Sequence, residues 1–373
     1  MDIALFFTYD YTLSLWNKSG TLNKELKIYQ NLAKKYGINF TIFTYGDDSE
    51  FSFENSLHGF KLIPIYSLTK MYKNKFLRFM ASFLIPFKIK KYLSEDTIIQ
   101  QHQLLGSWVT LILKLITGNP LYLRTGYDTY QFSIKENKNL VLKYFFKILT
   151  VLSLRYSDIY SVASNSDYKF LKNNFNLKNK KVQIRSNWVD SRGSTSSMRE
   201  KNRILSVGRL EDQKNYSLLF KELANTSETL TIDIVGTGTK KTELEDLAKE
   251  QNVNVNFIGS LENKELLSFY GKYYFFISTS KFEGNPKTIL EAMASGCVVI
   301  ASDIPNHKEL IDHRVNGILF DLNNPDLVNL IKEISKNQKL IDDISTKAIK
   351  KVESLNSLDV ISEKYFLDYK SLI

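Results

Sequence analysis

The chain has 373 residues, of which 43% are apolar and 13% aromatic, so it can bury substantial cores, and domains of roughly 100 to 200 residues imply two of them. The longest apolar stretches, 76–87 and 141–154, carry basic residues and fall short of the ~20 apolar residues that a membrane span needs, so we expect no transmembrane helix. The single cysteine, Cys297, excludes an internal disulfide framework, and its apolar surroundings indicate a small buried side chain and not a catalytic thiol.

The net charge of +10 is concentrated in the first half of the chain. Residues 1–190 hold 26 Lys and Arg against 14 Asp and Glu, whereas the remainder holds 24 against 26. Such asymmetry indicates an anionic partner for one half, which could be nucleic acid, an anionic membrane surface or a phosphorylated substrate.

The first segment has an acid at position 2 and no basic stretch, which predicts a buried strand and not a signal peptide, and hence a cytoplasmic protein. Short β-branched or aromatic runs then alternate with segments of helical period such as 22–36. This alternation predicts a parallel α/β domain. We expect its strands at 3–8, 39–45, 60–66, 97–101, 121–125, 158–163 and 181–186.

The stretch 191–202 is small and polar, which predicts a linker, and a second α/β domain follows it. The last stretch, 357–373, has apolar residues at helical spacing and predicts a terminal helix with one apolar face. We expect the strands of the second domain at 203–208, 231–236, 254–259, 274–279, 298–302 and 317–321.

Ligands of doubly wound sheets bind outside the carboxyl ends of the strands, so the expected site is a cleft where the two domains face each other. The segment 206–216 follows the first strand of the second domain and places Arg209 and Lys214 in the loop and the first turn beyond it. Both cations should therefore point into that cleft.

The stretch 281–302, KFEGNPKTILEAMASGCVVIAS, holds two carboxylates eight residues apart, Glu283 and Glu291. Pro286 suits the first turn of a helix and Asn285 fits its capping position. The free N–H groups and the dipole of that helix would bind an anion, and carboxylates accept hydrogen bonds from paired sugar hydroxyls. A phosphate site between two diol acceptors describes a nucleotide-sugar site.

This E-x7-E stretch, with SVGRLEDQKN at 206–215, VGTG at 235–238, FIGSL at 257–261 and NGILFD at 316–321, resembles the retaining glycosyltransferases of the GT-B fold, in the group that includes bacterial mannosyl- and glucosyltransferases of surface polysaccharides. The elements follow the family's order over nearly all of 203–321. The resemblance implies two Rossmann-like parallel-sheet domains facing a cleft, with a C-terminal helix that crosses back to the first domain. The expected limits are 1–190 with 355–373 for the acceptor domain, 191–202 for the linker, and 203–354 for the nucleotide-sugar domain.

The resemblance implies a role for each of four residues in the second domain. Glu283 would contact the donor sugar, Glu291 would hold the nucleotide ribose, and Arg209 and Lys214 would bind the diphosphate. The expected donor site also includes Gly208, Asn285, Pro286, Lys287 and Thr288.

The first domain matches the family less tightly. Segment 16–26 has no Gly-Gly pair where the family has a glycine-bearing acceptor loop, and Gly20 is the glycine that remains there as a candidate for the acceptor side. His102 stands at a strand end and is a candidate catalytic residue, although a histidine in that position is often only structural. Gln103 and Arg124 are candidates for the acceptor side.

The implied function is a retaining, metal-independent transfer from a UDP- or GDP-linked sugar to a hydroxyl of a glycan or lipid-linked acceptor, in the synthesis of capsule, O-antigen or lipopolysaccharide. No D-x-D occurs, so no metal is suggested, and no cofactor besides the donor substrate is expected. Segment 235–244 lacks the spacing of a P-loop and the third glycine of a dinucleotide fingerprint. The alternatives are a GT-B epimerase and a non-catalytic binder of a sugar nucleotide or of nucleic acid.

Each site residue also has a plainer interpretation. Glu291 could be a solvated helix charge, although its apolar neighbours favour a buried position that needs a partner. Arg209 and Lys214 could be an exposed loop pair, because Glu211 and Asp212 lie between them, and Lys287 could face solvent.

The stretch 69–93 contains seven basic residues and no acid, and its apolar residues follow helical spacing, with Pro86 expected to bend it. It could be an ordinary helix whose apolar face packs on the sheet. The absence of acids favours a peripheral patch that binds an anionic membrane surface through 70–91, on the inner face of the cell membrane. Large apolar residues between the basic ones argue against nucleic acid.

Overall fold

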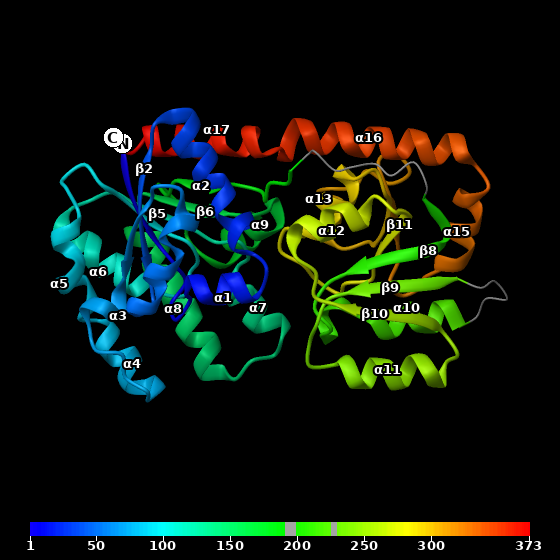
Figure 1. The fold of residues 1–373 in the computed structure, drawn as a ribbon, viewed down its shortest axis with the longest axis horizontal. Coiled ribbons are helices and arrows are strands. Elements are labelled where there is room, and N and C mark those ends of the chain that lie inside the picture. Colours follow the sequence, from blue (N-terminus) through cyan, green and yellow to red (C-terminus); the bar gives the residue numbers. More distant parts are fainter. Residues whose placement is uncertain (191–198, 225–229) are drawn as a thin grey trace. The chain divides into compact units, whose positions relative to one another are not determined.

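The computed structural model describes residues 1–190, 199–224 and 230–373 and divides the chain into two compact units (Figure 1). The first unit comprises Met1–Ser186 with Ser362–Ile373, and the second comprises Asn187–Ile361. Within these described ranges, no helix is both long and apolar enough to cross a membrane.

The first unit is built on a seven-stranded sheet with the order β3-β2-β1-β4-β5-β6-β7, in which all neighbours are parallel. β1 lies centrally and pairs Ile3 with Phe40 on one side and with Ile98 on the other. The strands are β1 (Asp2–Phe6), β2 (Asn39–Thr44), β3 (Lys61–Pro64), β4 (Ile98–Gln101), β5 (Leu121–Arg124), β6 (Ile159–Val162) and β7 (Val182–Ile184).

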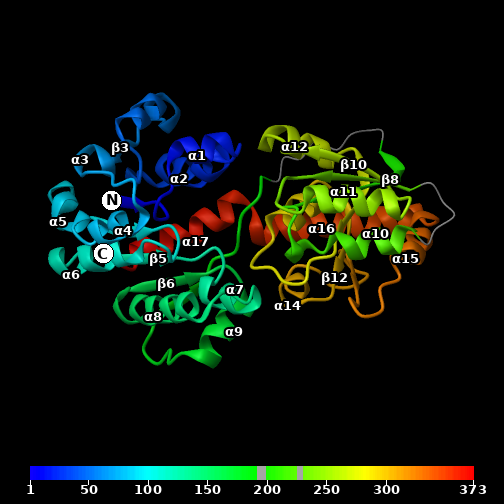
Figure 2. The same cartoon turned by 90° about the horizontal axis from the view of Figure 1, so that it is seen from below.

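Helices connect these strands and cover both faces of the sheet (Figure 2). They are α1 (Leu13–Lys18), α2 (Leu22–Tyr36), α3 (Ile65–Leu68), α4 (Lys75–Ser82), α5 (Ile85–Ile89), α6 (Ser107–Thr117), α7 (Thr129–Lys135), α8 (Leu140–Tyr156) and α9 (Asn165–Asn174), with 3-10 turns at Asp48–Leu57 and Lys90–Tyr92. The stretch 69–93 therefore forms two short helices, and Pro86 lies in the first turn of the second.

The second unit is built on a six-stranded parallel sheet with the order β10-β9-β8-β11-β12-β13. Its strands are β8 (Glu200–Val207), β9 (Thr231–Val235), β10 (Asn254–Gly259), β11 (Tyr273–Ser278), β12 (Val298–Ser302) and β13 (Ile318–Phe320). Its helices are α10 (Tyr216–Ala224), α11 (Lys241–Glu250), α12 (Asn263–Tyr270), α13 (Lys287–Ala294), α14 (Pro305–Lys308), α15 (Leu327–Ser335) and α16 (Gln338–Asn356), with a 3-10 turn at Asp212–Lys214.

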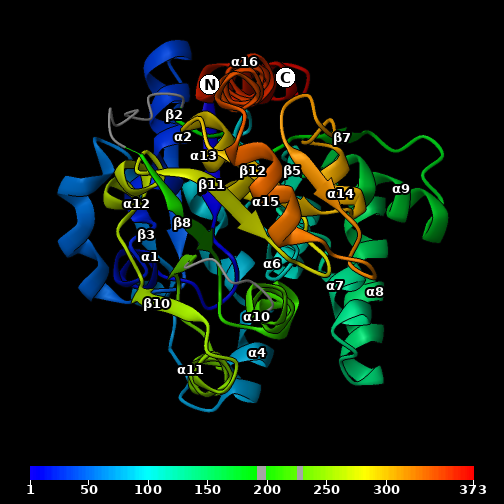
Figure 3. The ribbon, with the colours of Figure 1, turned by 90° about the vertical axis from the view of Figure 1, so that its right-hand side faces the viewer.

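Helices lie on both faces of the second sheet (Figure 3), and a hydrophobic core lies between the sheet and the helices on each face. Phe220 of α10 and Leu244 of α11 pack on one face, and Ile289 and Met293 of α13 pack on the other. A parallel sheet covered in this way needs strands that are apolar on both sides. The run Val298–Ala301 is buried at every position, which explains why short continuous apolar runs predicted these strands.

The last helix, α17 (Leu358–Lys370), returns to the first unit and covers one face of its sheet. Tyr122 of β5 contacts the rings of Tyr365 and Tyr369, and Tyr36 of α2 stacks on Phe366 at a centroid distance of 4.0 Å. The predicted terminal helix with an apolar face is thus present, and its apolar face is buried.

The expected domain limits differ from the two units, because the first unit ends at Ser186 and resumes at Ser362, where 190 and 355 were expected. The expected end of the linker differs as well. Residues 191–198 of the expected linker lie outside the described residues, but Glu200–Asn202, at its end, belong to β8. The backbone N–H of Glu200 donates to the carbonyl oxygen of Lys272, next to β11. Pairing with a neighbouring strand thus extends β8 into a polar segment whose composition did not predict a strand.

We expect Asp368→Ala to destabilise the first unit strongly. Arg185 donates two hydrogen bonds to this carboxylate, at 2.6 and 2.5 Å, and Tyr122 donates a third at 3.2 Å, while Asp368 is only 4% exposed. Removing it leaves the half-buried Arg185 guanidinium without its counter-ion, which costs about 2–3 kcal/mol. Urea denaturation measures the loss. The control is Asp343→Ala in the exposed pair with Lys347, where the loss should stay below ~1 kcal/mol; equal losses would contradict the prediction.

Candidate functional site

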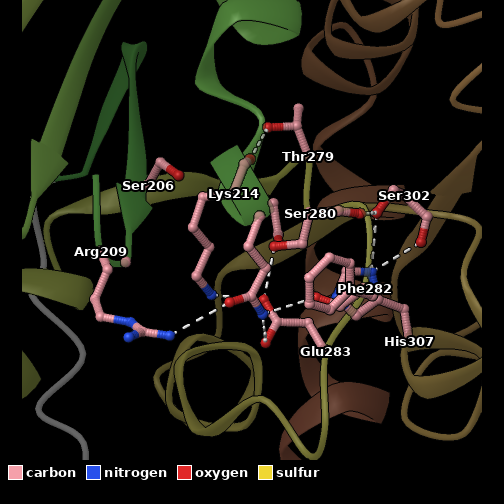
Figure 4. A network of polar contacts seen from close by, with 12 residues as sticks. Ser206, Arg209, Lys214, Thr279, Ser280, Phe282, Glu283, Ser302 and His307 are labelled. Carbon is pink, nitrogen blue, oxygen red and sulfur yellow. Dashed lines mark hydrogen bonds and ion pairs between the residues drawn. The ribbon is translucent and has the colours of Figure 1, made fainter. Parts of the chain in front are cut away.

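The candidate site lies at the carboxyl ends of β8 and β11 in the second unit (Figure 4). The loop after β8 carries Arg209 and Lys214, and the loop after β11 carries Glu283. Thr279 joins the two loops, because its hydroxyl donates to the carbonyl oxygens of Lys214 and Asn215 at 2.8 and 3.0 Å. The carboxyl ends of parallel strands meet at one edge of the sheet, so residues about 70 positions apart come together there.

Glu283 is the centre of the polar network in Figure 4. Its Oε1 accepts hydrogen bonds from Lys214 Nζ at 2.6 Å and from the Ser280 hydroxyl at 2.7 Å. Its Oε2 accepts only a longer hydrogen bond, from Gln213 Nε2 at 3.3 Å. The side chains of Lys214 and Glu283 are 13% and 9% exposed, so the ion pair is largely shielded from water.

The protonation state of Glu283 follows from these contacts. Burial by itself would raise the pKa of its carboxyl, but the Lys214 ammonium and the hydrogen bond from Ser280 outweigh burial and hold the pKa below its ordinary value. Glu283 is therefore ionised at neutral pH. The less occupied Oε2 leaves acceptor capacity for a ligand hydroxyl.

The two expected cations occupy different environments. Lys214 is held in the ion pair, whereas Arg209 is exposed and its Nη2 lies 3.4 Å from Gln213 Oε1. A side chain at Gly208 would push Lys214 out of its present position, because a Cβ there would lie 2.7 Å from Lys214 Cε. The loop after β9 comes equally close, since a Cβ on Gly236 (φ 146°) would lie 2.0 Å from the Gly208 carbonyl oxygen. Glycines at these positions let the two loops approach each other.

Helix α13 differs in one respect from the expected motif. Its N-cap is Pro286, and no side chain caps it, so the expected capping role of Asn285 is wrong. The Asn285 side chain instead accepts a hydrogen bond from Asn187 N–H at 2.9 Å, which draws it away from the helix. Lys287 and Thr288 occupy the first turn and are half-buried, and first-turn N–H groups have no acceptor within the helix.

Glu291 lies on the inner side of α13 and is 2% exposed, so it is not a solvated helix charge. The Tyr270 hydroxyl of α12 donates to its Oε2 at 3.2 Å. This contact meets the predicted need of the buried carboxylate for a partner.

The remaining candidates lie in the first unit, at the carboxyl ends of β4 and β5. His102 is buried, its Nδ1 lies 3.1 Å from the Tyr29 hydroxyl, and its Nε2 lies 3.8 Å from Glu25 Oε2. Burial by itself would lower the pKa of the Arg124 guanidinium, but Tyr365, Tyr29 and Glu25 raise the pKa above its ordinary value. One polar cluster thus includes His102 and Arg124.

Gln103 and Gly20 have backbone roles in the same unit. Gln103 Oε1 accepts a hydrogen bond from Gly126 N–H at 2.9 Å and so ties the loops after β4 and β5 together. Gly20 lies in the turn between α1 and α2 with φ 67°, a left-handed conformation that favours glycine. The segment 16–26, where the family has an acceptor loop, here comprises the end of α1, this turn and the start of α2, which agrees with the helix predicted over 22–36.

Sequence reasoning missed three neighbours of Glu283. Gln213 stands inside the segment 206–215 and Ser280 directly precedes the segment 281–302, so their nearness in sequence to Lys214 and Glu283 was an available signal. His307 gave none. Its ring is buried beside this network, Nδ1 donates to the Ser302 carbonyl oxygen at 2.8 Å, and Nε2 has no hydrogen-bond partner among the described residues.

Burial lowers the pKa of His307 from 6.5 to about 4, so its ring is neutral at pH 7.

The residues that the structure describes include no group of three or more His, Cys, Asp or Glu side chains placed to hold a metal ion.

Comparisons with known proteins agree with this architecture. The model of the family "Glycosyl transferases group 1" matches residues 190–351. The chain is 27% identical over 245 residues to an N-acetylgalactosamine-N,N'-diacetylbacillosaminyl-diphospho-undecaprenol 4-alpha-N-acetylgalactosaminyltransferase of Campylobacter jejuni, covering 63% of this chain and 66%, just under two thirds, of that protein. It is also 27% identical over 296 residues to the O-antigen biosynthesis glycosyltransferase WbnH of Escherichia coli, covering 78% and 81%.

Among solved structures, the chain is similar to Anabaena HepE in complex with UDP, with a TM-score of 0.78 at 16% identity over the full length of both chains. This likeness shows the fold. The predicted class is confirmed: two parallel-sheet α/β domains of the GT-B type.

We expect Lys214 and Glu283 to be strongly coupled in stability. Lys214→Met leaves a buried carboxylate without its cation and should lower the free energy of unfolding by about 3–5 kcal/mol. In the double variant Lys214→Met/Glu283→Gln, the charge itself is gone, so the loss should be smaller than the sum of the single losses by ~1–3 kcal/mol. Chemical denaturation of the four proteins gives the coupling. The same cycle on the exposed Lys347–Asp343 pair is the control, and equal coupling in both would contradict a shielded pair.

We expect stability to fall as the pH drops from about 6.5 to about 4, in part because of His307. Its folded-state pKa is lowered to about 4, so within this window the unfolded chain binds a proton that the folded chain does not. At 1.36 kcal/mol for each pKa unit, the contribution is about 3 kcal/mol. His307→Asn should flatten this part of the stability curve, whereas His58→Asn, at an exposed histidine, should leave it unchanged. Identical curves for wild type and His307→Asn would refute the assignment.

Proposed function

We propose that the protein is a glycosyltransferase that moves a sugar, with retention at the anomeric carbon and without a metal, from a nucleoside diphosphate sugar to a hydroxyl of an acceptor. The observation that carries the proposal is the shielded Lys214–Glu283 pair, beside Arg209 and at the carboxyl edge of the second sheet. Support comes from the family match over 190–351, which contains all of these residues.

The donor site would use this edge of the sheet. Arg209 and Lys214 would bind the diphosphate together with the first-turn N–H groups of α13, and Glu291 would accept hydrogen bonds from the ribose diol. Glu283 Oε2 would accept a hydroxyl of the donor sugar while Oε1 keeps Lys214 in place. Gly208, Asn285, Pro286, Lys287 and Thr288 would line the same site.

The chemistry would consist mainly of stabilising the leaving group. The bond between the anomeric carbon and a diphosphate oxygen breaks, the acceptor oxygen bonds to the same face of the sugar, and the proton of the acceptor hydroxyl passes to the departing diphosphate. Negative charge grows on the diphosphate during this step, and Arg209, Lys214 and the helix dipole are fixed groups that would stabilise it. Because Glu283 holds Lys214 before any ligand binds, little reorganisation would be needed.

The donor and acceptor classes rest on the relatives. HepE has been crystallised with UDP-glucose, which supports a UDP-linked donor over a GDP-linked one. The Campylobacter relative's name describes a diphospho-undecaprenol acceptor, and the Escherichia relative's name describes O-antigen biosynthesis. We therefore infer a lipid-linked glycan acceptor and a peripheral position on the inner face of the cell membrane, with 70–91 at its surface. His102, Gln103, Arg124 and Gly20 would serve the acceptor side.

We expect Arg209→Ala to lower turnover at least 100-fold, about 3 kcal/mol of transition-state stabilisation, without loss of fold, because the side chain is exposed.

Glu291→Gln should weaken donor binding, since the amide donates where the ribose needs an acceptor. A panel of UDP- and GDP-sugars, screened by saturation-transfer NMR and then by sugar transfer, measures both. Arg314→Ala, an exposed arginine paired with Glu333, is the control and should keep full activity.

The same panel separates the alternatives. Transfer should continue in EDTA, and loss of activity that magnesium restores would overturn the metal-free mechanism. A sugar nucleotide that is epimerised without an acceptor would identify an epimerase instead. Binding without any turnover would leave a non-catalytic sugar-nucleotide binder.

A further inference from the structure

Two helices of the first unit, α4 and α8, expose rows of large apolar side chains. On α4 and just beyond it, Phe76 is 69% exposed and Leu84 is 66% exposed, and on α8 Leu140 is 81% exposed and Tyr144 is 66% exposed. These rows, which we call the apolar stripes, comprise Phe76, Leu77 and Met80 of α4 with Leu84 just beyond it, and Leu140, Val141, Tyr144 and Ile148 of α8. Within each helix the first three residues have the spacing i, i+1 and i+4, which places them on one helix face, and Ile148 continues the face of α8 at i+8.

The two stripes belong to one surface. Phe79 of α4 contacts Phe145 of α8 at a ring-centroid distance of 6.0 Å, and both rings pack on Trp108 of α6, at 5.2 and 6.1 Å. The figures show α4 and α8 on the same side of the first unit (Figures 1 and 2). Phe79 and Phe145, both partly buried, therefore occupy the core-facing side of the two helices, while the side chains of the apolar stripes remain exposed.

The charges around the stripes are of one sign. No acid occurs in 69–93 or in 139–157, while Lys73, Lys75 and Lys147 are exposed beside the stripes. Lys88, Lys90 and Lys91 are exposed at the end of α5 and in the turn after it. Arg78, in contrast, is engaged with Asp10 at 2.7 Å and contributes no free charge.

We propose that the apolar stripes insert together into the interface of an anionic membrane, with the flanking lysines on the lipid headgroups. Exposed apolar rows of this length on a folded chain indicate a partner surface. The uniform positive charge favours an anionic partner surface. It disfavours a second copy of the chain, because the lysines of the two copies would repel each other. Lysines near an anionic leaflet and aromatic side chains at its interface both make the free energy of membrane binding more favourable.

The proposal extends the segment inferred from the sequence in one respect: α8, which lies some 50 residues beyond the basic segment, supplies half of the inserted surface. Only the reason for membrane binding, which is to reach a lipid-linked acceptor, rests on the proposed function. The contact with lipid can therefore be tested without any enzymatic activity.

The first experiment is flotation of the full-length protein with vesicles of phosphatidylcholine alone or with 30% phosphatidylglycerol, where the lipid composition is our choice of probe. Binding should require the anionic lipid and weaken with salt. Leu140→Gln/Val141→Gln should reduce binding at least tenfold, as should Leu77→Gln/Met80→Gln, whereas Leu355→Gln/Leu367→Gln, at exposed apolar positions of α16 and α17, should not. Lys88→Glu/Lys90→Glu/Lys91→Glu should abolish binding, and Lys249→Glu/Lys264→Glu/Lys339→Glu should not.

The second experiment measures insertion directly. The only cysteine in the sequence, Cys297, is buried, so a cysteine placed at Tyr144 or Phe76 can be labelled selectively with a polarity-sensitive dye. With anionic vesicles, the fluorescence emission of both labels should shift to shorter wavelengths and should be quenched by spin-labelled lipid. The emission of a label at Leu355→Cys should not change. Labels at Phe76 that respond without those at Tyr144 would overturn the role of α8.

The outcomes separate this inference from the proposed function. If the stripe variants lose vesicle binding but still transfer sugar to a water-soluble acceptor, both proposals stand. If wild type binds vesicles but no sugar nucleotide, docking stands and the proposed function fails. Equal binding to neutral and anionic vesicles, binding to neither, or concentration-dependent dimers that the Leu140→Gln/Val141→Gln variant abolishes would overturn the membrane proposal.

Discussion

Both sheets of this protein consist entirely of parallel strands, and that constraint determines most of what surrounds them. Parallel neighbours must be connected by crossovers, so helices cover both faces and the strands have to be apolar on both sides. The same geometry aligns all the carboxyl ends of a sheet along one edge. Arg209, Lys214 and Glu283 meet for this reason, although two loops about 70 residues apart supply them.

A second consequence is that the last helix is part of the first unit's core. The face of β5 that carries Tyr122 has to be covered, and α17 covers it with Tyr365 and Tyr369. Asp368 on the same helix compensates Arg185. The C-terminal segment is thus held by both apolar packing and a buried ion pair, which makes it a structural component of a domain that begins some 360 residues earlier in the chain.

The candidate site shows how a buried carboxylate is kept charged. Glu283 has a cation, a hydroxyl and an amide around it, and these outweigh the effect of burial on its pKa. The arrangement leaves one carboxylate oxygen less occupied than the other, and it fixes Lys214 before a ligand arrives. Arg209, in contrast, is exposed and has to be ordered by whatever it binds. The two cations that the motif pairs therefore differ in preorganisation: Glu283 holds Lys214 at 2.6 Å, whereas Arg209 has a longer contact of 3.4 Å with Gln213.

Much of this protein can be inferred from its sequence, because the relevant signals are local. Apolar runs and helical periods gave the strand positions and the terminal helix, and turn residues with an anion-binding helix start marked Glu283, Glu291, Arg209 and Lys214. Only the tertiary structure decided which groups meet. Asn285 bonds to Asn187 and does not cap α13, His307 joins the Glu283 network, and β8 extends into a polar segment through its pairing. The same holds for α4 and α8: periodicity predicts an apolar face, but whether that face is covered depends on distant residues such as Trp108, whose position no local pattern specifies.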